Sequence, residues 1–263
     1  MLPVNFLVHL SLLRKNYSLI HSAAVEFEGR RYIFPAFGGI GKTILVAAIV
    51  FAGGKLYGDD LTIVNNSKVL GYPIDFSVYP YHMPLLKLND HSMMRRFKIT
   101  SMLNHITDFL ERFNTRPVKF FSVALNALKV HCVNVPPRRI FGENYLAESR
   151  PVDAVYYLSR VVSENKDIKV DSIDPRALAA ICANILLHEW HASVQYLQVY
   201  SALSTFSLVS LYNDTRRVFE HLFLACPCHS IQIPISLTAE QYQHQLLDIL
   251  YNQKSKVVEL RGV

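Results

Sequence analysis

The segment AFGGIGKT, residues 36–43, has the residue types and spacing of a loop that binds nucleotide phosphates. The full pattern is G-x-x-x-x-G-K-[ST]; Gly41, Lys42 and Thr43 fill its last three positions, and Ala36 stands at the first. Glycines tolerate the torsion angles that let backbone N–H groups converge on phosphate oxygens, and the start of a helix adds its dipole. The predicted nucleotide-binding residues are Gly38, Gly39, Ile40, Gly41, Lys42, Thr43 and Ile44.

Two neighbouring acids, Asp59 and Asp60, follow this loop in the segment YGDDLTIV. In phosphoryl transfer, Lys42 would reach the β and γ oxygens and the Thr43 hydroxyl would complete the coordination of Mg2+. One acid could hold the metal, directly or through water, while the other takes the proton of an incoming hydroxyl group. The predicted metal ligands are Thr43 and Asp60, and the predicted cofactors are ATP and Mg2+.

The geometry of a strand limits how both acids can reach the phosphates. Side chains alternate along a strand, so only one of Asp59 and Asp60 can face the phosphates unless the strand ends there. A solvated turn is the alternative interpretation, because Gly-Asp-Asp is also common in turns. An ordinary glycine turn at residues 36–41 would explain neither Lys42 nor Thr43.

The elements around the loop must position these residues. Apolar residues indicate strands over 18–27 and 31–34, a buried helix over 42–52 that Gly53 ends in a left-handed cap, and a strand flanking the acid pair. We expect that last strand beside the one that feeds the loop. The order of strand, glycine loop, helix and strand favours a layered α/β fold.

The C-terminal third of the chain is expected to be mostly helical. The whole chain is expected to form a single domain of residues 1–263, with a subdomain edge near 143–151. In the middle of the chain we expect an amphipathic helix over Ile99–Phe113, a segment over Val118–Val135 that fits a strand or a helix, and a strand over Ala154–Val162. Further on we expect a long helix from Asp174-Pro175 to about Tyr196, a helix over Ser207–Phe223 and a short strand over Ile231–Ile235. Thr238 and Gln241 form a capping box that begins a final helix.

Composition narrows the class of protein. With 51% hydrophobic and 18% charged residues, the 263-residue chain can bury a real core. The longest apolar run, residues 44–52, is far shorter than the roughly 20 residues that cross a bilayer, so no membrane span is expected. The N-terminus lacks the marks of a secretory signal, which favours a cytoplasmic protein. The net charge of +6 is scattered, so no nucleic-acid partner is expected.

The stretch from Ile20 to Val64 resembles the catalytic core shared by HPr kinase/phosphorylase and phosphoenolpyruvate carboxykinase. The resemblance rests on three ordered elements: His21 in a strand, the loop that ends in GKT, and the Asp59-Asp60 pair. It implies an α/β P-loop kinase core in which His21 lies near the acids and the γ-phosphate. It also implies that Lys42 and Thr43 serve ATP and Mg2+, and that the two acids supply base and metal functions.

Other clusters fit a metal or anion site less well. In HEWH, residues 188–191, the histidines are three positions apart, whereas the zinc-protease pattern needs four. The CPCH segment, residues 226–229, is interpreted as buried free thiols. Arg138 and Arg139 could clamp a phosphate or lie solvated on the surface. A lone histidine such as His21 is most often a satisfied core residue, and its place in the shared pattern is what favours a site role.

The sequence therefore predicts an ATP-dependent kinase that transfers the γ-phosphoryl group to a hydroxyl, of serine in a peptide or protein or of a small metabolite. The sequence lacks the glycine-rich signature that HPr kinase/phosphorylase carries after the acid pair, and this departure favours an acceptor other than HPr. An oligomer is compatible with the resemblance. Two alternatives stay open: a nucleotide-binding regulatory or assembly protein without phosphotransfer, and a structural partner that has lost nucleotide binding, as Ala36 would signal. GTP or pyrophosphate could replace ATP.

Overall fold

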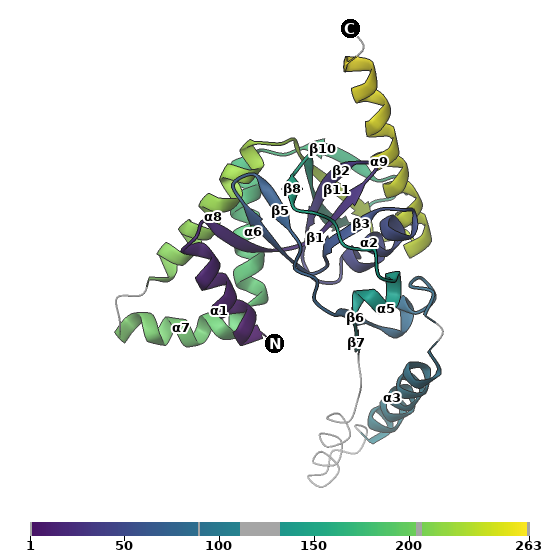
Figure 1. Cartoon of the computed structure of the whole chain (residues 1–263). Coiled ribbons are helices and arrows are strands. Elements are labelled where there is room, and N and C mark those ends of the chain that lie inside the picture. Colours follow the sequence, from purple (N-terminus) through teal and green to yellow (C-terminus); the bar gives the residue numbers. More distant parts are fainter. Residues whose placement is uncertain (1, 89, 111–131, 204–206, 262–263) are drawn as a thin grey trace. The chain divides into compact units, whose positions relative to one another are not determined.

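A computed structural model describes residues 2–88, 90–110, 132–203 and 207–261 (Figure 1). The chain divides into two compact units. The first comprises Met1–Ile74 with Glu143–Val263, and the second comprises Asp75–Gly142. The loop and acid pair both belong to the first unit, which therefore holds the candidate site.

The first unit is built on a mixed sheet in which β1 has three partners. In the described residues nine strands follow the order β10-β11-β9-β2-β1-β4-β5-β8, with β3 also paired to β1. The pairs β2–β9 and β9–β11 are parallel, and the others are antiparallel. The strands are β1 (Tyr17–Phe27), β2 (Arg30–Pro35), β3 (Lys55–Gly58), β4 (Leu61–Asn65), β5 (Lys68–Leu70), β8 (Arg150–Pro151), β9 (Ala154–Val161), β10 (Lys169–Ser172) and β11 (Cys228–Pro234).

Strand β1 changes partners along its length. Its first half pairs with β4, in a register that sets His21 opposite Leu61. Its second half pairs with β2, where Ser22 is opposite Pro35, and with β3 on the other edge. The change of partner falls at His21 and Ser22, beside the end of the strand that feeds the loop. This register brings His21 to the loop and to the acid pair.

Helices cover this sheet. Helices α1, α6 and α8 contact β1, and α8 also contacts β4; α2 contacts β1, β3 and α9. Figure 1 shows α6 and α8 on one side of the strands and α2 and α9 on the other. The helices of this unit are α1 (Leu2–Leu13), α2 (Lys42–Phe51), α6 (Pro175–Glu189), α7 (His191–Leu203), α8 (Leu208–Leu224) and α9 (Ala239–Arg261).

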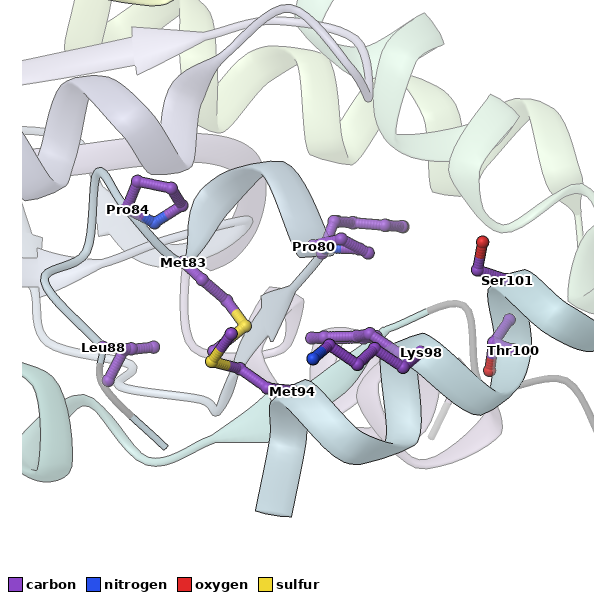
Figure 2. A pocket seen from close by; sticks show the side chains of 10 residues that line it. Pro80, Met83, Pro84, Leu88, Met94, Lys98, Thr100 and Ser101 are labelled. Carbon is purple, nitrogen blue, oxygen red and sulfur yellow. The ribbon is translucent and has the colours of Figure 1, made fainter. Parts of the chain in front are cut away.

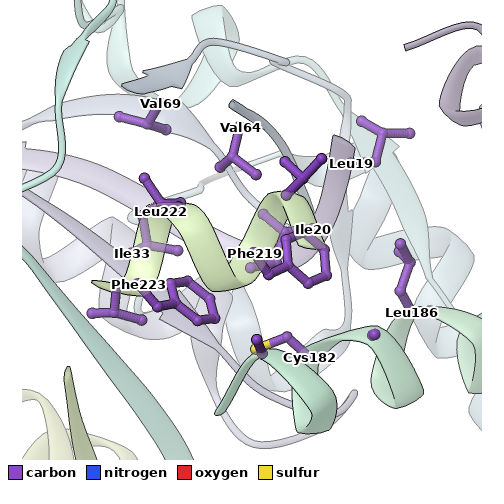
Figure 3. Packing of buried hydrophobic residues seen from close by; sticks show 14 of the residues in the cluster. Leu19, Ile20, Ile33, Val64, Val69, Cys182, Leu186, Phe219, Leu222 and Phe223 are labelled. Atoms are coloured by element: carbon purple, nitrogen blue, oxygen red, sulfur yellow. The ribbon is translucent and has the colours of Figure 1, made fainter. Parts of the chain in front are cut away.

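A hydrophobic core of the first unit lies between the sheet and helices α6 and α8. Phe219, Leu222 and Phe223 of α8 meet Ile20 and apolar residues of neighbouring strands (Figure 3). These side chains are almost completely buried. Fully burying such a side chain stabilises the fold by about 1.5–3 kcal/mol, so this layer holds β1 in place under the site.

The second unit, Asp75–Gly142, has its own pair of strands and its own helices. It contains β6 (Phe76–Val78) paired with β7 (Val133–Val135), a short 3-10 helix (Pro80–His82), α3 (His91–Leu110) and α5 (Pro137–Phe141). A cavity of about 760 Å³ is lined by residues that include Met83, Met94 and Phe97. Figure 2 shows the side chains of Met83 and Met94 pointing toward one another across it.

The predicted α/β fold and the mostly helical C-terminal third are confirmed. Helix α2 ends as expected, since Gly53 has a φ of 96° and its N–H bonds to Val50 O. The capping box of α9 is also present: Thr238 N–H donates to Gln241 Oε1, and Gln241 N–H donates to Thr238 Oγ1. The last three residues of the helix predicted over 99–113, and most of the ambiguous segment 118–135, lie outside the described residues.

Two expectations are wrong. The strand that leads to the acid pair, β3, does not lie beside β2, because β1 pairs with both and separates them. The predicted long helix is two helices: α6 ends at Glu189, and Trp190 has a φ of −102° and a ψ of 18° before α7 begins. Trp190 departs from helical geometry where its ring packs edge-on against Phe6, at a centroid distance of 5.5 Å.

Among the described residues, no helix is both long and apolar enough to cross a membrane.

We predict that Gly58→Ala lowers the free energy of unfolding by about 1–3 kcal/mol, as overpacking does. A Cβ at Gly58 would lie 2.5 Å from the carbonyl oxygen of Leu61 and 3.2 Å from that of Tyr72. Urea denaturation measures the change. Gly71→Ala is the control, since its Cβ would meet nothing closer than 3.5 Å. Equal stability of the two variants would contradict the prediction.

Candidate phosphate-binding site

The loop between β2 and α2 has the backbone that the glycine spacing predicts. Gly39 and Gly41 have φ values of 76° and 111°, in the left-handed region that favours glycine. Gly41 is the N-cap of α2, so the loop runs directly into the start of a helix. Ala36 is buried and is not among the described residues with positive φ. Alanine therefore fits the first position of the pattern without backbone strain.

The loop presents N–H groups that no atom of the described residues accepts. Within the described residues, the N–H groups of Gly39, Ile40 and Gly41 donate no hydrogen bond, and a Cβ at Gly39 would meet nothing within 4 Å. Together with the start of α2, such free N–H groups form an anion-binding concavity. We call residues Gly38–Thr43 the phosphate cradle.

Lys42 is the buried cation of the site. Its Nζ donates to the carbonyl oxygens of Ala36 at 3.1 Å and Phe37 at 3.0 Å, and it lies 2.8 Å from His21 Nε2. The ammonium is thus held under the loop by groups of β1 and of the loop itself. Burial lowers the pKa of Lys42, while the charges of Asp60, Asp59 and Glu189 oppose that shift.

Thr43 and Asp59 form the shortest contact of the site. The Thr43 hydroxyl donates to Asp59 Oδ2 at 2.6 Å. The other carboxylate oxygen, Oδ1, is buried and has no hydrogen-bond partner among the described residues. Burial, reinforced by the charge of Asp60, raises the pKa of Asp59 to about 7. An unpartnered buried carboxylate oxygen is costly, and a bound cation or proton would satisfy it.

Asp60 and His21 complete the group. Asp60 Oδ1 lies 3.8 Å from Lys42 Nζ and 3.8 Å from His21 Nε2, and 54% of its side chain is exposed. His21 is buried; burial and the neighbouring charge of Lys42 lower its pKa to about 4. At neutral pH, His21 is therefore a neutral imidazole that can accept a hydrogen bond from Lys42.

A sharp bend allows both acids to reach the loop. Strand β3 ends at Gly58, Asp60 has a φ of 71°, and Leu61 N–H bonds back to Asp59 O at 2.9 Å. The side-chain alternation of a continuous strand is therefore interrupted between the two acids. Asp59 reaches Thr43 and Asp60 approaches Lys42 from this bend.

The structure thus brings together His21, Lys42, Thr43, Asp59 and Asp60. Ile44 is the third residue of α2, and its side chain is buried. Its carbonyl oxygen accepts a hydrogen bond from Gln243 Nε2 at 3.0 Å.

Glu189, the last residue of α6, also lies at the site, and the sequence did not single it out. Its Oε1 accepts the N–H of Gly38 at 3.4 Å and lies 3.8 Å from His21 Nε2. No local pattern marks this residue, because 151 positions separate it from Gly38. Its only signal in the sequence is membership of the HEWH segment.

Arg160 and Tyr242 support the loop from behind. Arg160 Nε donates to Ile40 O at 3.3 Å, its Nη1 donates to Pro234 O at 3.2 Å, and its guanidinium lies over the Tyr242 ring at 5.3 Å. A Cβ at Gly41 would come within 3.1 Å of Tyr242 Cε1. Gly41 is thus required by close packing as well as by its φ angle.

The remaining candidates do not join this group. Cys228 Sγ bonds to Phe223 O and Cys226 Sγ to Leu222 O, and both thiols are free. His188 packs edge-on against Phe37 at a centroid distance of 5.8 Å. Arg139, in the second unit, pairs with Asp90 at 2.5 Å. Among the described residues, no group of three or more His, Cys, Asp or Glu side chains is placed to hold a metal ion.

The donor set nevertheless fits Mg2+ bound together with phosphate. Mg2+ commonly takes one or two carboxylates with substrate phosphates and water, rather than a cage made of protein alone. The Thr43 hydroxyl and the unpartnered Oδ1 of Asp59 are hard oxygen donors next to the phosphate cradle. The exposed carboxylate of Asp60 is a third.

Comparison with solved structures finds the Hpr(Ser) kinase/phosphatase from Coxiella burnetii. Its TM-score is 0.40 and its identity is 9%, over 93% of this chain and 98% of that chain. No protein-family model and no curated protein matches the sequence. A likeness this distant shows nothing about chemistry.

We predict that Asp59→Asn stabilises the metal-free protein increasingly as pH rises. Because the folded pKa of Asp59 lies above its unfolded value, folding favours its protonated form, and this contribution is lost as pH rises toward about 7. Asparagine keeps an acceptor for Thr43 and cannot ionise. Between about pH 4 and about pH 8, the variant should gain more than about 1 kcal/mol over wild type.

Urea denaturation in the presence of a chelator measures this difference. The titration of His21 affects both proteins and largely cancels in the comparison. Asp167→Asn, at an exposed position, is the control and should show no such gain. A difference between Asp59→Asn and wild type that does not grow with pH would contradict the prediction.

Proposed function

We propose that this protein is an ATP-dependent kinase that transfers the γ-phosphoryl group to a hydroxyl group of a peptide, protein or small metabolite. The observation that carries the proposal is the convergence of the acid pair on the loop: Thr43 bonds to Asp59 at 2.6 Å, and Lys42 lies 3.8 Å from Asp60. A glycine turn without such a role would require neither a buried lysine nor two acids beside it from the bend between β3 and β4.

Lys42 serves the charge that develops on the transferred group. Its ammonium now donates to loop carbonyl oxygens and contacts His21, so it is held within the site. The free N–H groups of Gly39, Ile40 and Gly41 supply further fixed donors. Preorganised donors in a site of low dielectric are the main means by which enzymes stabilise such charge.

Thr43 and Asp59 are the residues that we assign to the metal. When bound, Mg2+ neutralises the β and γ oxygens of the nucleotide. Thr43 Oγ1 and Asp59 Oδ2 already lie 2.6 Å apart, so their oxygens are on the same side of the loop. The bend that follows Gly58 fixes the backbone of Asp59, and burial restricts its side chain.

Asp60 is the residue that we assign to the acceptor's proton. More than half of its side chain is exposed, so an incoming hydroxyl can reach it, whereas Asp59 is buried. A general base must lie within hydrogen-bond reach of the proton that it removes. His21, neutral and 2.8 Å from Lys42 Nζ, helps to hold the cation beside Asp60.

We predict that Lys42→Ala lowers the rate of phosphoryl transfer more than about tenfold, since each ~1.36 kcal/mol of lost transition-state stabilisation gives that factor. The assay is incubation with γ-labelled ATP, Mg2+ and fractionated host extract, followed by identification of the labelled molecule. Lys68→Ala, at an exposed lysine in β5, is the control. Labelling by Lys42→Ala at the wild-type rate would refute the mechanism.

We predict further that Asp60→Asn abolishes turnover and changes the Kd for ATP by less than about threefold. The amide keeps the shape of the side chain but cannot take the acceptor's proton, whereas the phosphate cradle is untouched. Calorimetric titration with ATP and Mg2+ measures the binding. Nucleotide binding without any labelled product in wild type would instead support the regulatory alternative.

A further inference from the structure

The phosphate cradle already contains an anion, the carboxylate of Glu189. Its Oε1 accepts the Gly38 N–H at 3.4 Å and lies 3.6 Å from the position that a Cβ of Gly38 would take. The same oxygen is 3.8 Å from His21 Nε2. Glu189 is one third exposed, so its carboxylate sits at the mouth of the cradle rather than beneath it.

The position of Glu189 is unfavourable for its own helix. It is the last residue of α6, and a negative charge at a helix C-terminus opposes the helix dipole. The groups that stabilise the carboxylate belong instead to the loop and its surroundings: the Gly38 N–H and the charge of Lys42 at the start of α2. These are the groups that a nucleotide phosphate would use.

The backbone at Glu189 is fixed by its neighbours, whereas one third of its side chain is exposed to solvent. The next residue, Trp190, is 2% exposed, and its ring packs against Phe6 and His9 of α1. The Trp190 N–H bonds to Leu186 O at 3.2 Å. The carboxylate can therefore leave Gly38 by side-chain rotation without any movement of α6.

We propose that Glu189 is an internal competitor for the nucleotide phosphates, which occupies the Gly38 N–H in the free protein and is displaced when ATP binds. The proposal rests on the proposed function of the cradle. Two anions cannot share this N–H without strong repulsion, because two like charges in contact near a protein surface are only partly screened by water. A ligand must offset this repulsion through its contacts with Lys42 and Gly39–Thr43.

The consequence is selectivity among anions. A small anion that reaches only the outer part of the loop meets Glu189 and gains little from the inner donors. A triphosphate with Mg2+ contacts Lys42, Thr43 and the free N–H groups, and can displace the carboxylate. A metal-binding role for Glu189 would predict the opposite effect of removing its charge, namely weaker binding in the presence of Mg2+.

The test is the affinity of the full-length protein for ATP with Mg2+, measured by calorimetric titration. Glu189→Gln keeps the shape of the side chain and removes its charge. We expect its Kd to be at least about fivefold lower than that of wild type. Glu189→Ala should show the same direction. Glu148→Gln, at an exposed carboxylate paired with Arg150, removes the same charge elsewhere and should leave the Kd unchanged.

The outcomes separate the two proposals. Tighter binding by both Glu189 variants, or binding by them where wild type binds too weakly to measure, supports the competitor role. Unchanged or weaker binding by the Glu189 variants, with clear binding by wild type, overturns this role and leaves the proposed function standing. If wild type and all folded variants fail to bind ATP, both proposals are overturned. Thermal melting of each variant verifies that it is folded.

Discussion

The site depends on the way in which β1 divides its hydrogen bonds among three antiparallel strands. Its first half pairs with β4 and its second half with β2 and β3, and the change occurs at His21 and Ser22. Strand β2 leads into the loop, and β3 leads into the acid pair. One strand thereby fixes the distance between the cation under the loop and the carboxylates opposite it. Nothing in the loop alone could provide this.

The buried side chains of Lys42 and Asp59 require partners that are held in fixed positions. Placing Lys42 and Asp59 out of water is costly unless each has partners of suitable geometry. Lys42 has them: two carbonyl oxygens and His21. Asp59 has the Thr43 hydroxyl on one oxygen and, within the described part of the chain, no hydrogen-bond partner on the other. The protein therefore carries an incomplete polar network at the point where a ligand would complete it, which is typical of sites rather than of structural cores.

The sequence predicted what is local in the chain and missed what is distant. The glycine loop, the start of α2, its left-handed end and the capping box at Thr238 are patterns of adjacent residues with direct steric causes. The bend at the acid pair was foreseen as a condition, and the φ of Asp60 fulfils it. The place of β1 between β2 and β3 could not be deduced, because strand order depends on the packing of the whole sheet.

The residues that contact the loop but are distant from it in the sequence could not be predicted, for a related reason. Glu189 and Arg160 are ordinary residue types in ordinary segments, and they acquire meaning only through the tertiary fold. The break at Trp190 likewise follows from packing against α1, which helix propensity does not encode. The roles of His21, Lys42, Thr43, Asp59 and Asp60 remain predictions, now with a geometry on which they can be tested.

Residues of α9, near the C-terminus, contact the loop and the start of α2. Tyr242 lies behind Gly41 under the Arg160 guanidinium, and Gln243 holds the carbonyl oxygen of Ile44. A chain shortened before residue 238 would keep every residue of the nucleotide-binding pattern. It would lose the side chains of Tyr242 and Gln243, which pack against Gly41 and bond to Ile44. A fragment that keeps the observed packing of the loop must therefore include the final helix as well as the motif.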